Sequence, residues 1–159
     1  MLTSRFRDAI LRALARKLGY YGKTDQEANN IDMMAAAVED IKVPYLNLMY
    51  RAPPDIYAQE LSKFSTIVEN WIVHIAKFHE SHGKKEFIAG ENISFADFLV
   101  YEQLITLEYL FPKLLDTYLD LKAYLEKIQT RPNVKAYLLS GKRPVKVNNS
   151  GLGAMPVAA

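Results

Sequence analysis

The first candidates for a functional site in this sequence are its three histidines, which all fall within one short segment. His74, His79 and His82 lie on one expected helix, and the last two are three residues apart. Side chains at that spacing share a helix face, so both could bind one metal ion. A complete site needs further ligands, and only Glu80 and Glu86 are close in the chain. Solvated histidines at a helix end are therefore the favoured interpretation, and we predict no metal site.

Other catalytic residue types are absent from the sequence or lack a recognisable arrangement. The chain has no cysteine, which excludes disulfides, thiolate catalysis and cysteine-ligated metals. No phosphate-binding glycine loop appears, and no serine–histidine–acid pattern stands out. The ten tyrosines are consistent with an aromatic ligand pocket, but tyrosines at helical spacing more often pack in the core and at its rim.

The balance of charge excludes some classes of partner. The 159 residues include 20 Lys+Arg and 18 Asp+Glu, a net charge of +2, which gives no electrostatic argument for binding nucleic acid. The dibasic pairs Lys84-Lys85 and Lys142-Arg143 are typical of surface charge, with an acidic protein partner as the alternative. No apolar run is long enough to cross a membrane, so we expect neither nucleic acid as a partner nor membrane insertion.

The elements that must position these residues are all expected to be helices. Apolar side chains recur at three- and four-residue steps, and no alternating strand pattern appears. Capping and breaking residues predict helices over 4–18, 24–50, 55–82 and 94–109, one opening at Thr117 or Asp120, and one over 132–139. We predict an all-α helical domain over residues 1–140, in which about six helices surround one central buried helix, and an extended tail over 141–159.

The segment over residues 94–109 is the best candidate for the central helix. Ser94 is a strong N-cap, and Asp97 is placed to accept a hydrogen bond from the amide of Ser94, which predicts a capping box. The residues that follow are apolar on most faces, which is typical of a helix that is buried nearly all round. Thr24 and Glu27 have the same spacing and predict a second capping box.

Residues 89–98, with the sequence Ala-Gly-Glu-Asn-Ile-Ser-Phe-Ala-Asp-Phe, resemble the loop and capping box that open the central helix in the C-terminal domain of glutathione transferases. Residues 9–12, Ala-Ile-Leu-Arg, resemble the first helix of this all-helical domain in mu-class-like members. The likeness spans roughly residues 2–137. It implies the fold of that domain, and it implies dimerisation that takes place partly through the first two helices.

In that family a preceding thioredoxin-like domain supplies the catalytic residue and most glutathione contacts, and this sequence shows no βαβ pattern for such a domain. Family members also carry a Gln/Glu-Ser pair that holds the γ-glutamyl end of glutathione, and the matching positions here are Phe6 and Arg7. Phenylalanine cannot replace an amide, and Arg7 would meet the glutathione ammonium with like charge. The resemblance places Asp40 where an aspartate serves the neighbouring subunit's glutathione, and Tyr50 where a tyrosine lines the electrophile pocket. The structural alternatives are a solvated carboxylate for Asp40 and a core or rim aromatic for Tyr50.

These observations lead to one expected function and two rivals. The changed boundary pair and the missing catalytic half predict a non-catalytic, glutathione-transferase-like domain that acts as a structural or interaction subunit of a larger assembly, with no catalytic residue and no cofactor. The first rival is a glutathione transferase whose thioredoxin-like half is supplied by another chain, with glutathione bound with the help of Asp40 and Tyr50. The second rival is a carrier of apolar ligands in a preformed cavity between helices. Expected partners are other protein subunits or a second copy, which would cover the apolar face left by the first helix and the segment near Tyr50.

We expect a cytoplasmic location, which fits the lack of cysteine pairs. The first 17 residues contain four arginines, one acid and apolar residues at helical spacing, a pattern also seen in mitochondrial presequences. An ordinary first helix is the favoured interpretation of this segment. A mitochondrial location and a cytoskeletal assembly stay open as alternatives.

Overall fold

The structure is a computed structural model that describes residues 2–82 and 86–142. It confirms the all-α class, because the described residues form six helices and no strand apart from an isolated bridge between Phe87 and Gly90. In chain order the helices are α1 (Leu2–Leu18), α2 (Asp25–Arg51), α3 (Tyr57–Ser81), α4 (Phe95–Leu110), α5 (Leu119–Thr130) and α6 (Pro132–Leu139). Most of the predicted tail, from residue 143 onward, lies outside the described residues.

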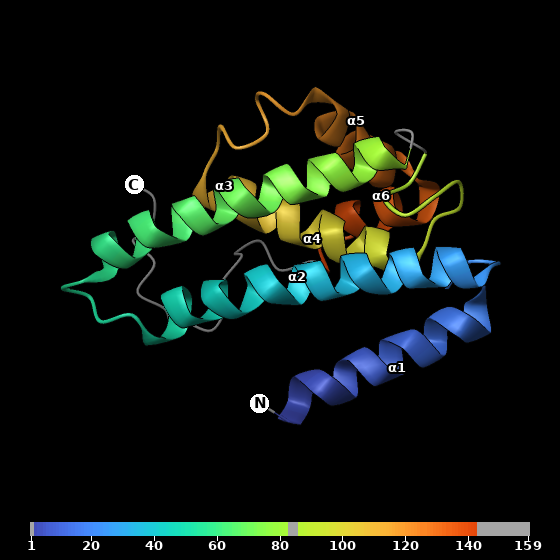
Figure 1. Ribbon diagram of the computed structural model, residues 1–159, viewed down its shortest axis with the longest axis horizontal. Coiled ribbons are helices and arrows are strands. Elements are labelled where there is room, and N and C mark those ends of the chain that lie inside the picture. The colour runs from blue at the N-terminus through green and yellow to red at the C-terminus, as the bar shows by residue number, and fades with distance from the viewer. Residues whose placement is uncertain (1, 83–85, 143–159) are drawn as a thin grey trace.

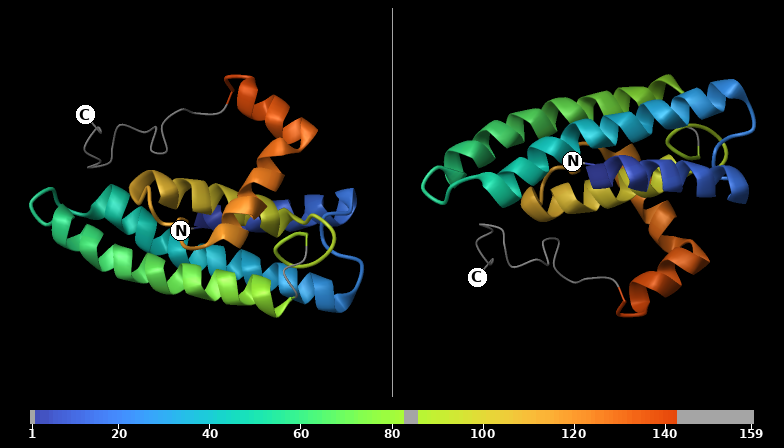
Figure 2. Two further views of the ribbon diagram at one scale, coloured as in Figure 1. Left: turned by 90° about the horizontal axis from the view of Figure 1, so that it is seen from above. Right: turned by 90° about the horizontal axis from the view of Figure 1, so that it is seen from below.

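Three helices form the body of the molecule. α2 and α3 run antiparallel and side by side, and α4 packs against this pair (Figure 1). α1 runs beside α2, while α5 and α6 form an arm that leads away from the α2–α3 pair (Figure 2). α6 has no buried residue, so burial of apolar surface contributes little to holding it in place.

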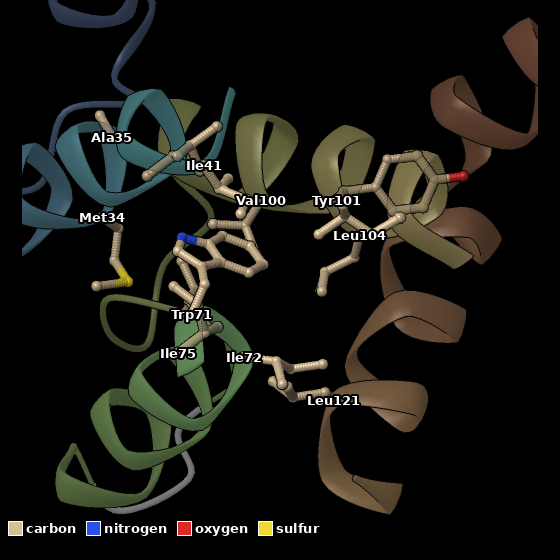
Figure 3. Close-up of a cluster of buried hydrophobic side chains, with 14 of the residues drawn as sticks. Met34, Ala35, Ile41, Trp71, Ile72, Ile75, Val100, Tyr101, Leu104 and Leu121 are labelled. Atoms are coloured by element: carbon tan, nitrogen blue, oxygen red, sulfur yellow. The ribbon is translucent and has the colours of Figure 1, made fainter. Parts of the chain in front are cut away.

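The core lies where α2, α3 and α4 meet (Figure 3). Val100 and Leu104 of the central helix α4 are fully buried. The indole of Trp71 reaches from α3 toward Ile41 and Val100, and its N–H donates to the backbone carbonyl oxygen of Ala37 at 2.7 Å. This bond satisfies the one polar atom of a large buried ring and ties α3 to α2.

The central helix begins at a buried carboxylate. The predicted capping box is present, with the Ser94 amide donating to Asp97 at 2.7 Å. The same carboxylate accepts hydrogen bonds from the Ser94 hydroxyl at 2.7 Å, the Ile88 amide at 2.8 Å and the Tyr124 hydroxyl at 3.0 Å. Burial raises the pKa of the Asp97 carboxyl, and the hydrogen bonds from Ile88, Ser94 and Tyr124 lower it part of the way back. One side chain therefore joins the loop before α4, the start of α4 and the middle of α5.

Several helix ends differ from their predicted positions by one or two residues. α1 begins at Leu2 rather than at Ser4, α3 covers Tyr57–Ser81 rather than 55–82, and α5 begins at Leu119, between the two predicted starts. Frayed ends and alternative caps commonly produce such shifts. By contrast, α6 begins at Pro132 as predicted, because proline has no amide to leave unsatisfied in the first turn.

The second predicted capping box is only half formed. The Thr24 hydroxyl accepts from the Glu27 amide at 3.2 Å, as predicted. The Glu27 carboxylate, however, accepts from the amide of Lys23 at 2.6 Å, and not from that of Thr24. Gly22 places the backbone before α2 close to Glu27. The Glu27 carboxylate therefore accepts its hydrogen bond from the Lys23 amide, just outside the helix.

Replacing either of two glycines in the turn between α1 and α2 is expected to lower the free energy of unfolding, by different amounts. Gly19 and Gly22 both have positive φ, +78° and +80°, but a Cβ at Gly22 would lie 2.7 Å from the Glu27 Cβ, whereas nothing lies within 4 Å of one at Gly19. We expect Gly19→Ala to lower the free energy of unfolding by about 1 kcal/mol, from backbone strain alone. Gly22→Ala should lower it by about 2 kcal/mol or more, because overlap with Glu27 adds to the strain. Urea denaturation of both variants measures the difference, and equal losses would contradict the role of the close approach.

Candidate functional site

The surface shared by α1 and α2 carries the boundary pair Phe6 and Arg7 that the sequence singled out. Arg7 directs its guanidinium toward carboxylates, with Nη2 lying 2.6 Å from Glu39 Oε1 and 2.7 Å from Asp8 Oδ1. Lys42 adds a second cation 3.2 Å from the same Glu39 oxygen. Phe6 is 66% exposed. At this boundary the chain therefore presents an apolar side chain and a guanidinium that is already paired.

A second polar cluster joins the other end of α1 to α2. Arg12 Nε lies 3.0 Å from Asp32 Oδ1, and the Tyr21 hydroxyl donates to Asp32 Oδ2 at 2.6 Å. The Arg16 guanidinium lies 4.2 Å from the centre of the Tyr21 ring, which stacks on Phe95 at 5.4 Å. Burial raises the pKa of Tyr21, and its hydrogen bond to Asp32 acts in the same direction. α1 is thus joined to α2 by an ion pair, and its aromatic contacts run through Tyr21 to the first residue of α4.

The side of α1 that these clusters leave open is apolar. Phe6, Ile10, Leu14 and Leu18 recur every four residues and are 66%, 61%, 48% and 63% exposed. We call these four residues the α1 stripe. Contiguous apolar patches of this kind mark surfaces that bind another protein or domain.

Asp40 and Tyr50, the two predicted binding residues, both lie on α2. Asp40 is exposed, and Tyr50 is 44% exposed. Ten residues of α-helix span about 15 Å, so the structure places the two side chains at separate positions and does not bring them together. Both are accessible to a ligand or a partner.

Two buried tyrosines accompany Tyr50 near the end of α2. Tyr45 of α2 and Tyr57 of α3 are 7% and 9% exposed. Burial raises the pKa of Tyr45 to about 12, with smaller contributions in the same direction from Tyr50 and Tyr57. Sequence reasoning missed this grouping, although the Pro53-Pro54 break predicts a short hairpin loop that returns the chain to the same end of the bundle.

The histidines do not form a metal site among the described residues. His79 is buried, with its ring centre 6.1 Å from that of Tyr124. His82 places Nδ1 2.8 Å from the Phe78 carbonyl oxygen at the end of α3. Within residues 2–82 and 86–142, no group of three or more His, Asp or Glu side chains could hold a metal ion. In the same part of the chain, no helix is long and apolar enough to cross a bilayer.

The side chains of this surface are of types that bind ligands or partners. The Asp40 carboxylate can accept hydrogen bonds from a cationic group, and the Tyr50 phenol can both donate and accept one. The α1 stripe adds apolar surface for a protein partner. Groups of these types hold and orient a ligand or a neighbouring domain.

Comparison with known sequences identifies a family. Residues 39–141 match the family described as "Glutathione S-transferase, C-terminal domain". The chain is 37% identical over 140 residues to glutathione S-transferase P of Homo sapiens, covering 84% of this chain and 62% of that protein. It is 36% identical over 151 residues to glutathione S-transferase P of Bos taurus, covering 89% of this chain and 67% of that protein. The chain therefore spans about two thirds of the length of these relatives.

Solved structures show the same likeness in three dimensions. The Pi-class glutathione S-transferase of Onchocerca volvulus superposes with a TM-score of 0.75 and 31% identity, covering 91% of this chain and 69% of that one. The glutathione S-transferase Blo t 8 gives a TM-score of 0.74 with 26% identity, covering 82% of this chain and 61% of that one.

Proposed function

Because the chain belongs to the glutathione S-transferase C-terminal domain family, we propose that it works as the helical half of a glutathione transferase, together with a thioredoxin-like domain. The observation that carries this proposal is the α1 stripe, whose four apolar side chains are 48–66% exposed. A surface of this kind is stable in water when another domain covers it. In the proposal the thioredoxin-like domain packs on the stripe and brings the catalytic residue with it.

Tyr50 and Asp40 then have distinct tasks. Tyr50, 44% exposed on α2, lines the pocket for the electrophile and donates a hydrogen bond to it. Asp40, exposed on the same helix, accepts hydrogen bonds from glutathione held by a second subunit, which requires a dimer. The relatives named above are P-type or Pi-class enzymes, and the mu-class type suggested by the sequence stays a prediction that substrate preference would decide.

The second candidate is a non-catalytic subunit of a larger assembly, and the boundary pair favours it. Arg7 is paired with Glu39 and Asp8, and Phe6 offers no hydrogen bond, so neither side chain is suited to hold the γ-glutamyl end of glutathione. In this case the α1 stripe docks a structural partner. The cytoplasmic location is proposed for both candidates.

Activity of the protein isolated from its native source, with its partners attached, tests the first candidate. We expect conjugation of glutathione to an aryl halide, and we expect Tyr50→Phe to lower kcat/KM by about tenfold, the worth of one hydrogen bond. Asp40→Asn should raise the KM for glutathione. Tyr137→Phe, which changes a tyrosine of similar exposure on α6 (48%), is the matched control and should leave both parameters unchanged.

The same preparation separates the two candidates. A defined complex that neither binds glutathione nor conjugates it would reject the transferase proposal and favour the structural subunit. Glutathione binding that responds to Asp40→Asn but not to Tyr137→Phe would reject the structural subunit.

A further inference from the structure

A cleft between the last turns of α3 and the start of α5 lies away from the surface discussed so far (Figure 1). It encloses about 440 Å³, within the range of small-molecule sites. Ala76, His79 and Glu80 line it from α3, at the three- and four-residue steps that define one helix face. Residues 117–121 line it from the segment that opens α5. Two segments far apart in the sequence therefore form the cleft together.

The inner part of the cleft is apolar and aromatic. His79 and Leu121, which are 6% and 1% exposed, form its floor. Ala76 and Tyr118 are half-buried and form its walls. An apolar ring of a ligand can pack against these side chains, because aromatic and aliphatic surfaces of this kind stabilise a bound ring.

The outer part of the cleft carries negative charge. Two of the lining residues are carboxylates, Glu80 and Asp120, and both are exposed. No lysine or arginine of the described chain belongs to the lining. Glu80 also makes no ion pair with another residue of 2–82 or 86–142. A cation at the mouth of the cleft is therefore favoured over an anion.

This cleft is separate from the proposed transferase site. Asp40, Tyr50 and the α1 stripe are not part of its lining. A ligand can therefore occupy it without contacting any of these residues, and the inference below does not rest on the proposed function.

We propose that the cleft binds an arylalkyl amine, a small molecule with an aromatic ring and one primary ammonium group. The ring packs between Tyr118 and Leu121. The ammonium lies at the mouth, where its three donors reach the carboxylates of Glu80 and Asp120. An alcohol of the same shape has one donor and no charge, so the cleft prefers the amine.

Calorimetric titration of the purified protein at pH 7 tests the proposal with a matched pair of probes, 2-phenylethylamine and 2-phenylethanol. The amine is protonated at this pH, as a lysine side chain is. We expect it to bind at least fivefold more tightly than the alcohol, a modest ratio because the carboxylates are exposed. Glu80→Gln should weaken the amine about threefold and leave the alcohol unchanged, and the double variant Glu80→Gln/Asp120→Asn should bind the two probes equally.

Two further variants separate this site from general effects. Glu69→Gln removes an exposed carboxylate of α3 that does not line the cleft, so it should leave both affinities unchanged. Ala76→Leu fills part of the cleft and should weaken both probes.

Equal binding of the two probes to the wild type, no binding of the amine, or the same loss of amine affinity in Glu69→Gln as in Glu80→Gln would overturn the proposal. Glu80→Gln decides the role of the mouth by itself if the double variant does not give a helical circular dichroism spectrum. Glutathione conjugation should be the same in Glu80→Gln as in the wild type, so failure here is distinct from failure of the proposed function.

Discussion

Replacement of Asp97 with asparagine is expected to lower the free energy of unfolding by about 3 kcal/mol or more, because several buried donors lose an acceptor at once. Asp97 is fully buried, and its two oxygens accept four hydrogen bonds, from Ile88, Tyr124 and two donors of Ser94. An asparagine amide of the same shape puts an NH₂ group where one oxygen stood, so donors face donors.

Urea denaturation followed by circular dichroism measures this loss. Tyr124→Phe removes a single one of the four donors and should cost about 1 kcal/mol. Asp40→Asn applies the same chemical change to an exposed carboxylate on α2 and should shift stability by no more than about 0.5 kcal/mol. A loss below about 1 kcal/mol for Asp97→Asn would show that the carboxylate is not the junction described here.

Replacement of Leu104 with alanine is expected to cost about 3 kcal/mol, the middle of the range for truncating a buried leucine. Leu104 is 0% exposed on the central helix (Figure 3), where neighbours from several helices limit collapse around the cavity. Leu119→Ala makes the identical change at the start of α5, where the leucine is 70% exposed. That control should change stability by less than about 0.5 kcal/mol, and the same denaturation experiment compares them. Similar losses in the two variants would contradict the central position of α4.

Local chemistry predicts much of the fold. Ser94 and Asp97 predict the start of α4 because their capping box depends on residues three apart, and Pro132 predicts the start of α6 because its ring fixes the backbone locally. The hydrogen-bond partner of the Glu27 carboxylate is harder to predict, because it depends on how closely the backbone at Gly22 approaches Glu27. The hydrogen bond from Tyr124 to Asp97 joins residues 27 apart in the chain, and the spacing of apolar residues does not indicate it.

The candidate site is predictable only in part. Asp40 and Tyr50 come from family resemblance, and their accessibility follows from the face of α2 on which they lie. The pairing of Arg7 with Glu39 spans 32 residues, so nothing in the local sequence indicates that this guanidinium is engaged.

The hydrogen bond from Trp71 to Ala37 allows tryptophan fluorescence to follow the unfolding of the contact between α3 and α2. Trp71 is the single tryptophan, so all indole emission comes from the junction of α3 with α2. Changes in emission wavelength therefore report water reaching that junction, and fraying of α1 or α6 does not change them. A fluorescence transition that coincides with loss of ellipticity means that the helices melt as one unit, and one that lags behind it means that the outer helices separate first.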